Sequence, residues 1–339
     1  MSALAPLTPE WHEERRKGIG SSDAAAILGL SSYARPIDIY LEKTGQAEAR
    51  EDTVFTAWGR RLEPIIAEAA EDALNQDTGF GDDGEYRTPV RFTQWTAAIH
   101  CRDWWPAFTH LDRRGRMDGV MVGLECKSAM STKGWGDPAT VSVADAHEVI
   151  PPAYAIQVGH HLLCTGYAAV YVAALIGYRD FRLYRVERDD AWLADLLADE
   201  RDWWERHVVA GVPPEPDGSD AYRAFLTRRL GEPTAELSAT PEQQLIGSRV
   251  VDAKRAADAA AKAYELERQR LEHSAGGAAA ITGPGWRLAL SSGRTSTSWA
   301  KAIADAGKAG VDTAALAPFV EKHTKTGEPS YRFTVTEEE

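Results

Sequence analysis

The sequence predicts an α/β (α+β) fold in which a central mixed sheet is flanked by helices, followed by a helical and small β appendage. Between residues 8 and 209, segments with helical periodicity alternate with short apolar segments typical of strands. A Pro- and Gly-rich stretch over 213–218 ends this pattern. Beyond it the chain is rich in alanine and charged residues, which favours a long helix.

The N-terminal part is predicted to be mostly helical. A short polar helix over 11–17 leads to the tight turn at Gly18–Gly20, and Ser21 or Ser22 can cap a helix that runs to Leu28. Two further helices are predicted over 36–45 and 53–74, the first opened by a proline and the second marked by an apolar stripe with helical spacing.

The sheet is predicted from the middle of the chain. Residues 87–127 have the patterns of strands and turns, and 169–176 and 181–186 are typical of two more strands. Helices over 152–165 and 189–209 alternate with these strands, and the second helix is amphipathic. Helices alternating with strands indicate a layered α/β core.

The C-terminal part starts with Thr240-Pro-Glu-Gln243, which has the spacing of a capping box. It opens a long helix to about His273, and a short helix near 298–306 lies within a small β-containing segment. We therefore predict a core domain over 1–212, a linker over 213–240 and an appendage over 241–339.

The composition is that of an ordinary soluble globular protein. Of 339 residues, 44 % are hydrophobic and 26 % are charged, and no apolar run approaches the ~20 residues of a membrane span. The N-terminus lacks a charged-then-apolar signal pattern, so the cytoplasm is the expected location. The three cysteines are far apart, which excludes an obvious zinc or iron–sulfur knuckle.

The most informative stretch runs from Asp118 to Lys127. If 124–127 is a strand, Glu125 and Lys127 share one face, while their apolar neighbours point to the other. A tight hairpin around Gly119 would bring Asp118 alongside them. Two carboxylates can hold Mg²⁺ with most of its water shell, and the lysine can orient an attacking water. The stretch predicts a metal-dependent phosphodiesterase site; the alternative is a surface hairpin with an ion pair.

Two helical residues are candidates to complete this site. Glu63 borders the apolar stripe of its helix, and Gln157 shares a helix face with Tyr154 and His161. A carboxylate can extend the metal site, and an amide can orient a phosphate or a water. The alternatives are a solvated helix glutamate and a partly buried polar residue bonded to backbone. The histidines, His160 among them, lack the spacing of metal ligands, so we expect them in the core or on the surface.

A second candidate site surrounds the turn at Gly18–Gly20. Arg15 precedes this turn and Ser22 follows it, at the start of a predicted helix. A guanidinium, a hydroxyl and the free N–H groups of a helix N-terminus together favour a phosphate. The alternative is that Ser22 only caps the helix.

The net charge of −13 is unusual for a protein that binds nucleic acid. Basic residues nonetheless cluster just before the candidate ligands Glu63 and Asp118. Solvated surface charge is the ordinary explanation for any one cluster, but two clusters beside ligands predict a basic channel for backbone phosphates. The residues concerned are Arg60, Arg61, Arg113, Arg114 and Arg116.

Together, these motifs resemble a known family over roughly residues 10–210. The family is that of the YqaJ-type viral recombinases, relatives of the lambda exonuclease within the PD-(D/E)xK nuclease superfamily. The matching motifs, in chain order, are Trp11-x(3)-Arg15-x(2)-Gly-Ile-Gly-Ser-Ser22-Asp, Leu41-Glu-Lys-Thr-Gly45, Gly59-x(3)-Glu63-Pro, Asp118-Gly…Glu125-Cys-Lys127 and Tyr154-x(2)-Gln157.

The resemblance implies a restriction-endonuclease-like core and a Mg²⁺-dependent exonuclease, with Mn²⁺ as a substitute. Such an enzyme digests one strand of linear duplex DNA from its 5′ end and leaves a 3′ single-stranded tail for phage-type recombination in a bacterial cytoplasm. It also implies a ring-shaped homotrimer and a single-strand-annealing partner. The alternatives are an endonuclease or RecB-like nuclease, and a catalytically silent DNA-binding recombination subunit.

The resemblance also implies a role for each matching residue. The metal ligands would be Asp118 and Glu125, the catalytic lysine Lys127, the assisting residues Glu63 and Gln157, and the 5′-phosphate ligands Arg15 and Ser22.

Overall fold

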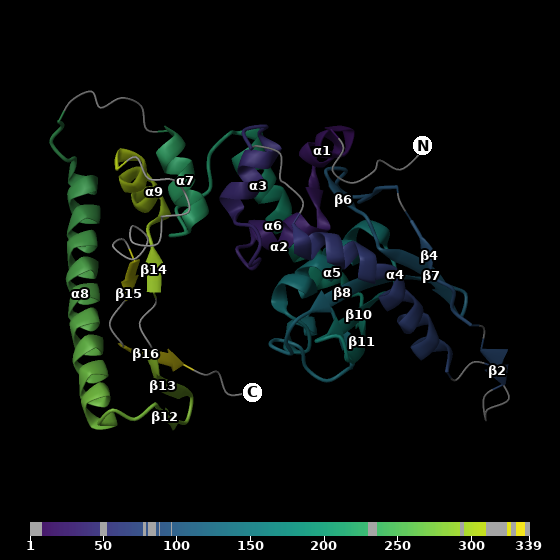
Figure 1. Cartoon of the computed structure of the whole chain (residues 1–339). Coiled ribbons are helices and arrows are strands. Elements are labelled where there is room, and N and C mark those ends of the chain that lie inside the picture. Colours follow the sequence, from purple (N-terminus) through teal and green to yellow (C-terminus); the bar gives the residue numbers. More distant parts are fainter. Residues whose placement is uncertain are drawn as a thin grey trace. The chain divides into compact units, whose positions relative to one another are not determined.

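The structure is a computed structural model of the chain (Figure 1). It describes residues 9–47, 53–76, 79–80, 86–87, 89–95, 97–229, 236–291, 295–309, 324–326 and 330–335. The chain divides into two compact units, Met1–Glu232 and Pro233–Glu339.

The first unit is built on a six-stranded sheet with the strand order β4-β7-β8-β10-β11-β9. The pairs β8–β10 and β11–β9 are parallel, and the other neighbours are antiparallel. The predicted core with a central mixed sheet flanked by helices is therefore confirmed. The strands are β4 (Thr93–Gln94), β7 (Arg113–Met117), β8 (Val120–Ala129), β9 (Thr140–Ser142), β10 (Ala169–Ile176) and β11 (Asp180–Glu187).

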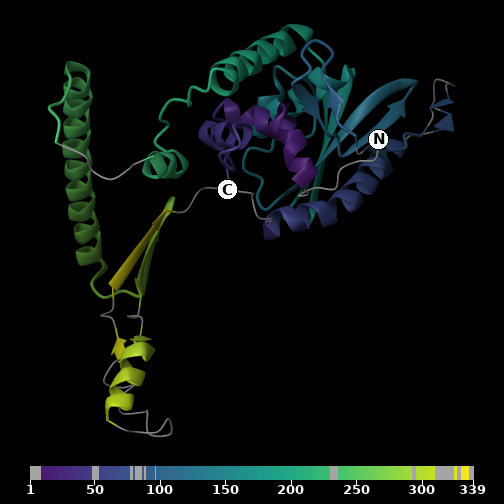
Figure 2. The same ribbon diagram turned by 90° about the horizontal axis from the view of Figure 1, so that it is seen from above.

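Strand β8 has one apolar face and one polar face, as predicted. Val122 and Leu124 are buried and pack against α4 (Val54–Asn75). Figure 2 shows α4 running along one side of the sheet. Glu125 and Lys127 alternate with the apolar residues and therefore face α5 (Pro152–Thr165) on the other side.

Helices α4 and α5 lie within one residue of their predicted ranges. The Thr53 side chain caps α4 by accepting a hydrogen bond from the backbone N–H of Thr56. Helix α5 ends at Gly166, whose φ of 68° is in the left-handed region that favours glycine. Local signals therefore place both helices that cover the two faces of β8.

A smaller sheet and three helices lie beside the main sheet. Its strand order is β1-β6-β5, and β1 runs parallel to β6. The prediction that Ser21 or Ser22 caps the following helix is wrong, because Gly20 is the cap residue and its N–H donates to Asp23. These elements are α1 (Pro9–Arg16), β1 (Ile19–Gly20), α2 (Ser21–Ile27), α3 (Pro36–Lys43), β5 (Ile99–His100) and β6 (Ala107–Thr109).

Helix α6 (Asp190–Trp203) packs closely on α5 and continues into a π-helical turn, η2 (Trp204–Val209). The close approach requires glycine at position 159, since a Cβ there would lie 2.4 Å from the ring of Trp192.

Helix α7 (Asp220–Arg229) lies inside the predicted linker over 213–240. Tyr222 and Phe225 on α7 are buried, and the ring of Phe225 lies edge-on to that of Tyr40. The first unit therefore extends beyond the predicted end at residue 212, because two aromatic residues on one face of α7 pack into its core.

The second unit contains a long helix and two small sheets. Its capping box at Thr240 and Gln243 opens α8, as predicted. No helix in the described part of either unit is long and apolar enough to cross a membrane. The elements of this unit are α8 (Pro241–Ala275), β12 (Ala280–Gly283), β13 (Trp286–Ser291), β14 (Thr295–Thr297), α9 (Trp299–Lys308), β15 (Thr324–Thr326) and β16 (Ser330–Val335).

Three short elements of the first unit complete the description. They are β2 (Gly79–Phe80), β3 (Tyr86–Arg87) and the 3-10 turn η1 (Ala146–Glu148).

Candidate active site

Glu125 and Lys127 project from β8 toward Gln157 on α5. The Nζ atom of Lys127 lies 2.7 Å from Oε1 of Glu125 and donates to Oε1 of Gln157 at 2.8 Å. The Nε2 atom of Gln157 in turn donates to Oε1 of Glu125 at 2.7 Å. The amide thus contacts both the acid and the amine, and the structure brings these three predicted residues together.

The other two residues on the predicted face of α5 reach the same group. The Nζ atom of Lys127 lies 4.5 Å from the ring centroid of Tyr154. The Nε2 atom of His161 lies 3.0 Å from Oε2 of Glu125, an ion-pair distance without hydrogen-bond geometry. The Nδ1 atom of His161 contacts Oγ1 of Thr109 at 2.6 Å. From the sequence we expected His161 simply in the core or on the surface. Its spacing from Gln157, which puts both residues on one helix face, was the signal that could have predicted its contact with Glu125.

Asp118 does not lie beside Glu125, so the predicted hairpin geometry is wrong. Met117 pairs with Val120, and Asp118 and Gly119 form the two-residue turn between them, with φ values of 48° and 81°. Asp118 is exposed. Glu125 lies five positions beyond Val120 along β8, roughly 17 Å at about 3.3 Å per residue.

The carboxylate that this hairpin brings to Glu125 is that of Asp112. The register pairs Arg113 with Leu124, so Asp112, one residue earlier, stands opposite Glu125. Its Oδ2 atom accepts a hydrogen bond from the backbone N–H of Cys126 at 2.7 Å. Asp-Gly between two strands is a strong hairpin signal, and counting back to the sixth pair from that turn, one beyond Arg113 and Leu124, would have identified Asp112.

The site brings more negative charge together than its lysine neutralises. Burial, and next the charges of Glu125 and Glu63, raise the pKa of Asp112 well above its usual range. Burial alone would also raise the pKa of Glu125, but Lys127 and His161 outweigh it and lower that pKa to about 2. Burial alone would lower the pKa of Lys127, but Glu125 and Asp112 outweigh it and raise that pKa.

Glu63 reaches this region from α4 and is held there by Arg113. The guanidinium donates to Oε1 of Glu63 and also to the backbone carbonyl of Asp112 at 2.6 Å. Both side chains are largely buried. The predicted proximity of Glu63 to the candidate ligands is thus seen, with Arg113 linking it to the backbone of Asp112, the residue just before β7.

Strand alternation divides the arginines of β7. Arg113 faces α4, whereas Arg114 and Arg116 pair with positions on the same face as Glu125. Arg114 lies over Trp95, with 3.3 Å from its Cζ to the ring centroid. Two of the three predicted DNA-binding arginines on this strand therefore lie on the side of the candidate site.

Arg60 and Arg61 lie on α4 and are exposed. The guanidinium of Arg61 lies over Trp58, 5.4 Å from its ring centroid. Both precede Glu63 on the same helix, so the prediction that they line the DNA channel stays open.

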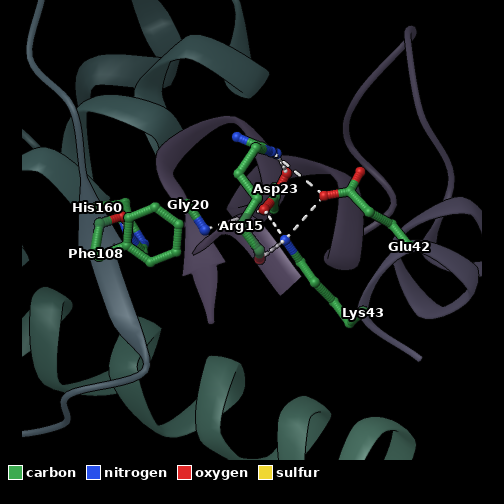
Figure 3. A network of polar contacts seen from close by, with 7 residues as sticks. All are labelled: Arg15, Gly20, Asp23, Glu42, Lys43, Phe108 and His160. Carbon is green, nitrogen blue, oxygen red and sulfur yellow. Dashed lines mark hydrogen bonds and ion pairs between the residues drawn. The ribbon is translucent and has the colours of Figure 1, made fainter. Parts of the chain in front are cut away.

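Arg15 belongs to a buried network of charges around Asp23 (Figure 3). Asp23 accepts from Arg15, from Lys43 at 2.6 Å and from the backbone N–H of Gly20 at 3.1 Å. Burial would raise the pKa of Asp23, but Arg15 and Lys43 outweigh it and hold that pKa below its usual range. The carboxylate is therefore fixed in its ionised form between two cations.

Lys43 and Glu42 complete this network. The Nζ atom of Lys43 also donates to Oε1 of Glu42 at 3.1 Å and to the backbone carbonyl of Arg15 at 2.8 Å, so all its donors are used. Ser22, the second residue of α2, is exposed and takes no part in these contacts. The structure thus places Arg15 and Ser22 near one turn but in different surroundings.

Asp112 and Glu125 are the residues that fit a hard divalent cation. Mg²⁺ binds one or two carboxylates and keeps several waters or phosphate oxygens. In the described part of the chain, no group of three His, Cys, Asp or Glu side chains could hold a metal by itself. Three protein contacts reach the oxygens of Glu125, which can accept about four. A two-carboxylate site therefore fits this donor set.

Residues 10–168 match the family model of the YqaJ-like viral recombinase domain, and this range contains the whole site. This segment is a YqaJ-like viral recombinase domain. The predicted resemblance is confirmed. The uncharacterized protein YqaJ of Bacillus subtilis (strain 168) is 33 % identical over 228 residues, which cover 66 % of this chain and 63 % of that protein. The chain thus matches less than two thirds of its relative's length.

Two solved structures are similar to part of this chain. An alkaline exonuclease (LHK-Exo) from Laribacter hongkongensis is 16 % identical, with 66 % of this chain and 97 % of that chain covered and a TM-score of 0.42. A phage related exonuclease from Haemophilus somnus 129PT is 9 % identical, with 57 % and 96 % covered and a TM-score of 0.40. Likeness this distant says nothing about the reaction of this chain.

Proposed function

We propose that the YqaJ-like domain is a metal-dependent exonuclease. It would digest linear double-stranded DNA from the 5′ end and leave 3′ single-stranded tails for phage-type recombination. The observation that carries this proposal is the juxtaposition of Asp112, Glu125 and Lys127, with Gln157 between the acid and the amine.

Each residue has a distinct part in this proposal. Asp112 and Glu125 would hold Mg²⁺, for which Mn²⁺ could substitute, and the ion would supply positive charge near the phosphate. Lys127 acts as a cation rather than a base, because its neighbours raise its pKa. It stabilises the negative charge that builds on the phosphate during hydrolysis. Gln157 fixes the direction of the lysine.

DNA is held outside this centre. Arg114 and Arg116 lie on the face of Glu125 and would contact backbone phosphates. Arg15, whose guanidinium contacts Asp23 and Glu42, would bind the terminal 5′-phosphate. A homotrimeric ring and an annealing partner remain predictions from the resemblance.

Purified protein should be incubated with Mg²⁺ and either linear or closed-circular duplex DNA. Loss of the linear DNA alone, with a 5′-terminal label released before a 3′-terminal label, supports the proposal. Asp112→Asn and Glu125→Gln are the inactive controls. Cleavage of the circle would indicate an endonuclease instead. Binding of DNA ends with no cleavage in Mg²⁺ or Mn²⁺ would indicate a silent recombination subunit.

A further inference from the structure

His160 is wholly buried on α5, and both of its ring nitrogens face an oxygen atom. The Nδ1 atom lies 2.7 Å from Oε1 of Glu200 on α6, and the Nε2 atom lies 2.9 Å from the backbone carbonyl of Phe108 on β6. Figure 3 shows His160 beside Phe108. Because a carbonyl and an ionised carboxylate only accept, a ring that satisfies both must carry a proton on each nitrogen.

Glu200 depends on this imidazolium. It is wholly buried, and its Oε2 atom has no hydrogen-bond partner among the described residues. A buried carboxylate without a compensating charge is strongly unfavourable. His160 is therefore the group that compensates the charge of Glu200, and the two residues form an ion pair inside the protein.

The elements packed around His160 present few other titratable groups. Burial alone would lower its pKa, but Cys164 and Glu200 outweigh burial and raise that pKa well above its usual range. On α2 the charged residue is Asp23, whose carboxylate forms ion pairs with Arg15 and Lys43. Others close by are His100 of β5, which stacks on Trp105, and His161 of α5.

The residues that follow His160 on α5 and Phe108 on β6 make a second contact between the same two elements. His160 bonds to Phe108, and His161 bonds to Thr109, so α5 is joined to β6 at two consecutive positions. The other nitrogen of His161 faces Glu125 in the candidate active site. The ion pair of His160 and Glu200 is therefore next to His161, the residue that contacts and orients the candidate metal ligand Glu125.

We propose that His160 and Glu200 are positioning residues for the active site. Their ion pair fixes α5 between β6 and α6, so that Gln157 and His161 meet Glu125 and Lys127 in the geometry described above. Neither residue contacts DNA or the reacting atoms. The kinetic test of this proposal rests on the proposed exonuclease function, whereas its spectroscopic test does not.

The spectroscopic test uses the full chain with ¹⁵N-labelled histidine. At pH 8, one histidine should give the NMR signals of a ring protonated on both nitrogens, when an ordinary histidine is neutral. The signals should be absent from the His160→Gln/Glu200→Gln variant, which removes both charges and so avoids leaving Glu200 unpaired. A neutral ring with its proton only on Nε2, accepting from a protonated Glu200, would overturn the ion pair.

The kinetic test uses Glu200→Gln, which keeps the shape of the side chain. Without the carboxylate, the pKa of His160 should fall, and the alkaline limb of the kcat profile should move down by about 1–3 pH units. The KM for DNA should not change. The control is Leu193→Ala, a buried change on the same helix that lowers stability but leaves the pair intact.

The two variants separate positioning from ordinary stability. At temperatures where the Leu193→Ala variant is folded, the alkaline limb of its kcat profile should lie at the same pH as in the wild type. The His160→Gln/Glu200→Gln variant has no imidazole at position 160, so the contribution of His160 to the alkaline limb of the kcat profile should disappear. Its kcat at high pH should therefore be higher than that of Glu200→Gln. A Glu200→Gln profile equal to that of the wild type would overturn the proposal. If the wild type has no nuclease activity, the function fails, and the NMR result alone decides on the pair.

Discussion

Asp112 stands opposite Glu125 at the end of the β7–β8 hairpin, one pair beyond Arg113 and Leu124. The tight turn at Asp118 and Gly119 fixes this register, since a turn of two residues allows no slippage without moving every side chain to the other face. A residue in the turn therefore cannot approach Glu125, whereas the residue just before β7 must.

The Asp112→Asn variant should lose nuclease activity by at least about 100-fold, because the bound ion contributes several kcal/mol to the transition state. Asp118→Asn is the matched control on the same hairpin and should retain activity within about twofold, since its side chain is exposed in the turn. Initial rates on linear duplex in Mg²⁺ measure both. Loss of activity in the Asp118 variant with a normal Asp112 variant would reverse the assignment.

Lys127→Met should also abolish hydrolysis while leaving DNA binding, because the lysine acts as a cation on the phosphate and not as a ligand. Ca²⁺ should support DNA binding without cleavage in the wild type, since it is larger and holds a looser geometry than Mg²⁺. Gel-shift assays in Ca²⁺ and rates in Mg²⁺ separate the two effects. Near-normal turnover by the Met variant would exclude the proposed role.

Asp23→Asn should destabilise the first unit by about 3–5 kcal/mol at neutral pH, because it leaves two buried cations without their shared acid. The folded-state pKa of Asp23 is lowered, so its stabilisation is present above the unfolded value of about 3.9 and is lost as the pH falls below it.

Denaturant unfolding between pH 3 and pH 8 checks this dependence. The difference between wild type and Asp23→Asn should be constant near neutrality and shrink below about pH 4. Asp202→Asn, which removes an exposed ion pair with Arg206, should cost at most about 1 kcal/mol. If the difference in unfolding free energy between wild type and Asp23→Asn stayed constant at acid pH, this would contradict an ionised Asp23 in the network.

Arg15→Ala should reduce the preference for 5′-phosphorylated over 5′-hydroxyl ends. Removing one charge-assisted hydrogen bond costs about 1.5–3 kcal/mol, so roughly a tenfold effect or more is expected. Lys43→Met should reduce the same preference, since Lys43 bonds both Asp23 and the Arg15 carbonyl. Degradation rates of the two end types measure it. Equal ratios in wild type and Arg15→Ala would make Arg15 a structural residue only.

Neutralising Arg114 and Arg116 together should weaken DNA binding and flatten its salt dependence. The logarithmic slope should change by about 0.9 for each DNA phosphate that the protein no longer neutralises. Changing Arg255 and Arg270 on α8, which pair with acids on their own helix, is the matched control and should leave the slope unchanged. Binding measured over a salt series gives both slopes. An unchanged slope in the β7 variant would remove these arginines from the DNA path.

Local patterns in the sequence were enough to predict the elements around the site. The alternation in β8 placed Glu125 and Lys127 on one face, and the helical spacing of Tyr154, Gln157 and His161 placed them on another. Both patterns depend only on the geometry of a single strand or helix, so they can be derived from neighbouring residues.

Which side chains meet depends instead on how these elements pack. The register of two strands gave Glu125 its partner Asp112, and the packing of α5 on β6 brought His161 to that acid. The folding of α3 onto α1 buried Lys43 beneath Arg15. These contacts join residues that lie far apart in the chain, and their energies depend on burial and on charges from several elements. The periodicity of a single strand or helix carries no information about such distances, which is why it pointed to Asp118. The Asp-Gly turn is the one local signal that does, because it sets the register that brings Asp112 to Glu125.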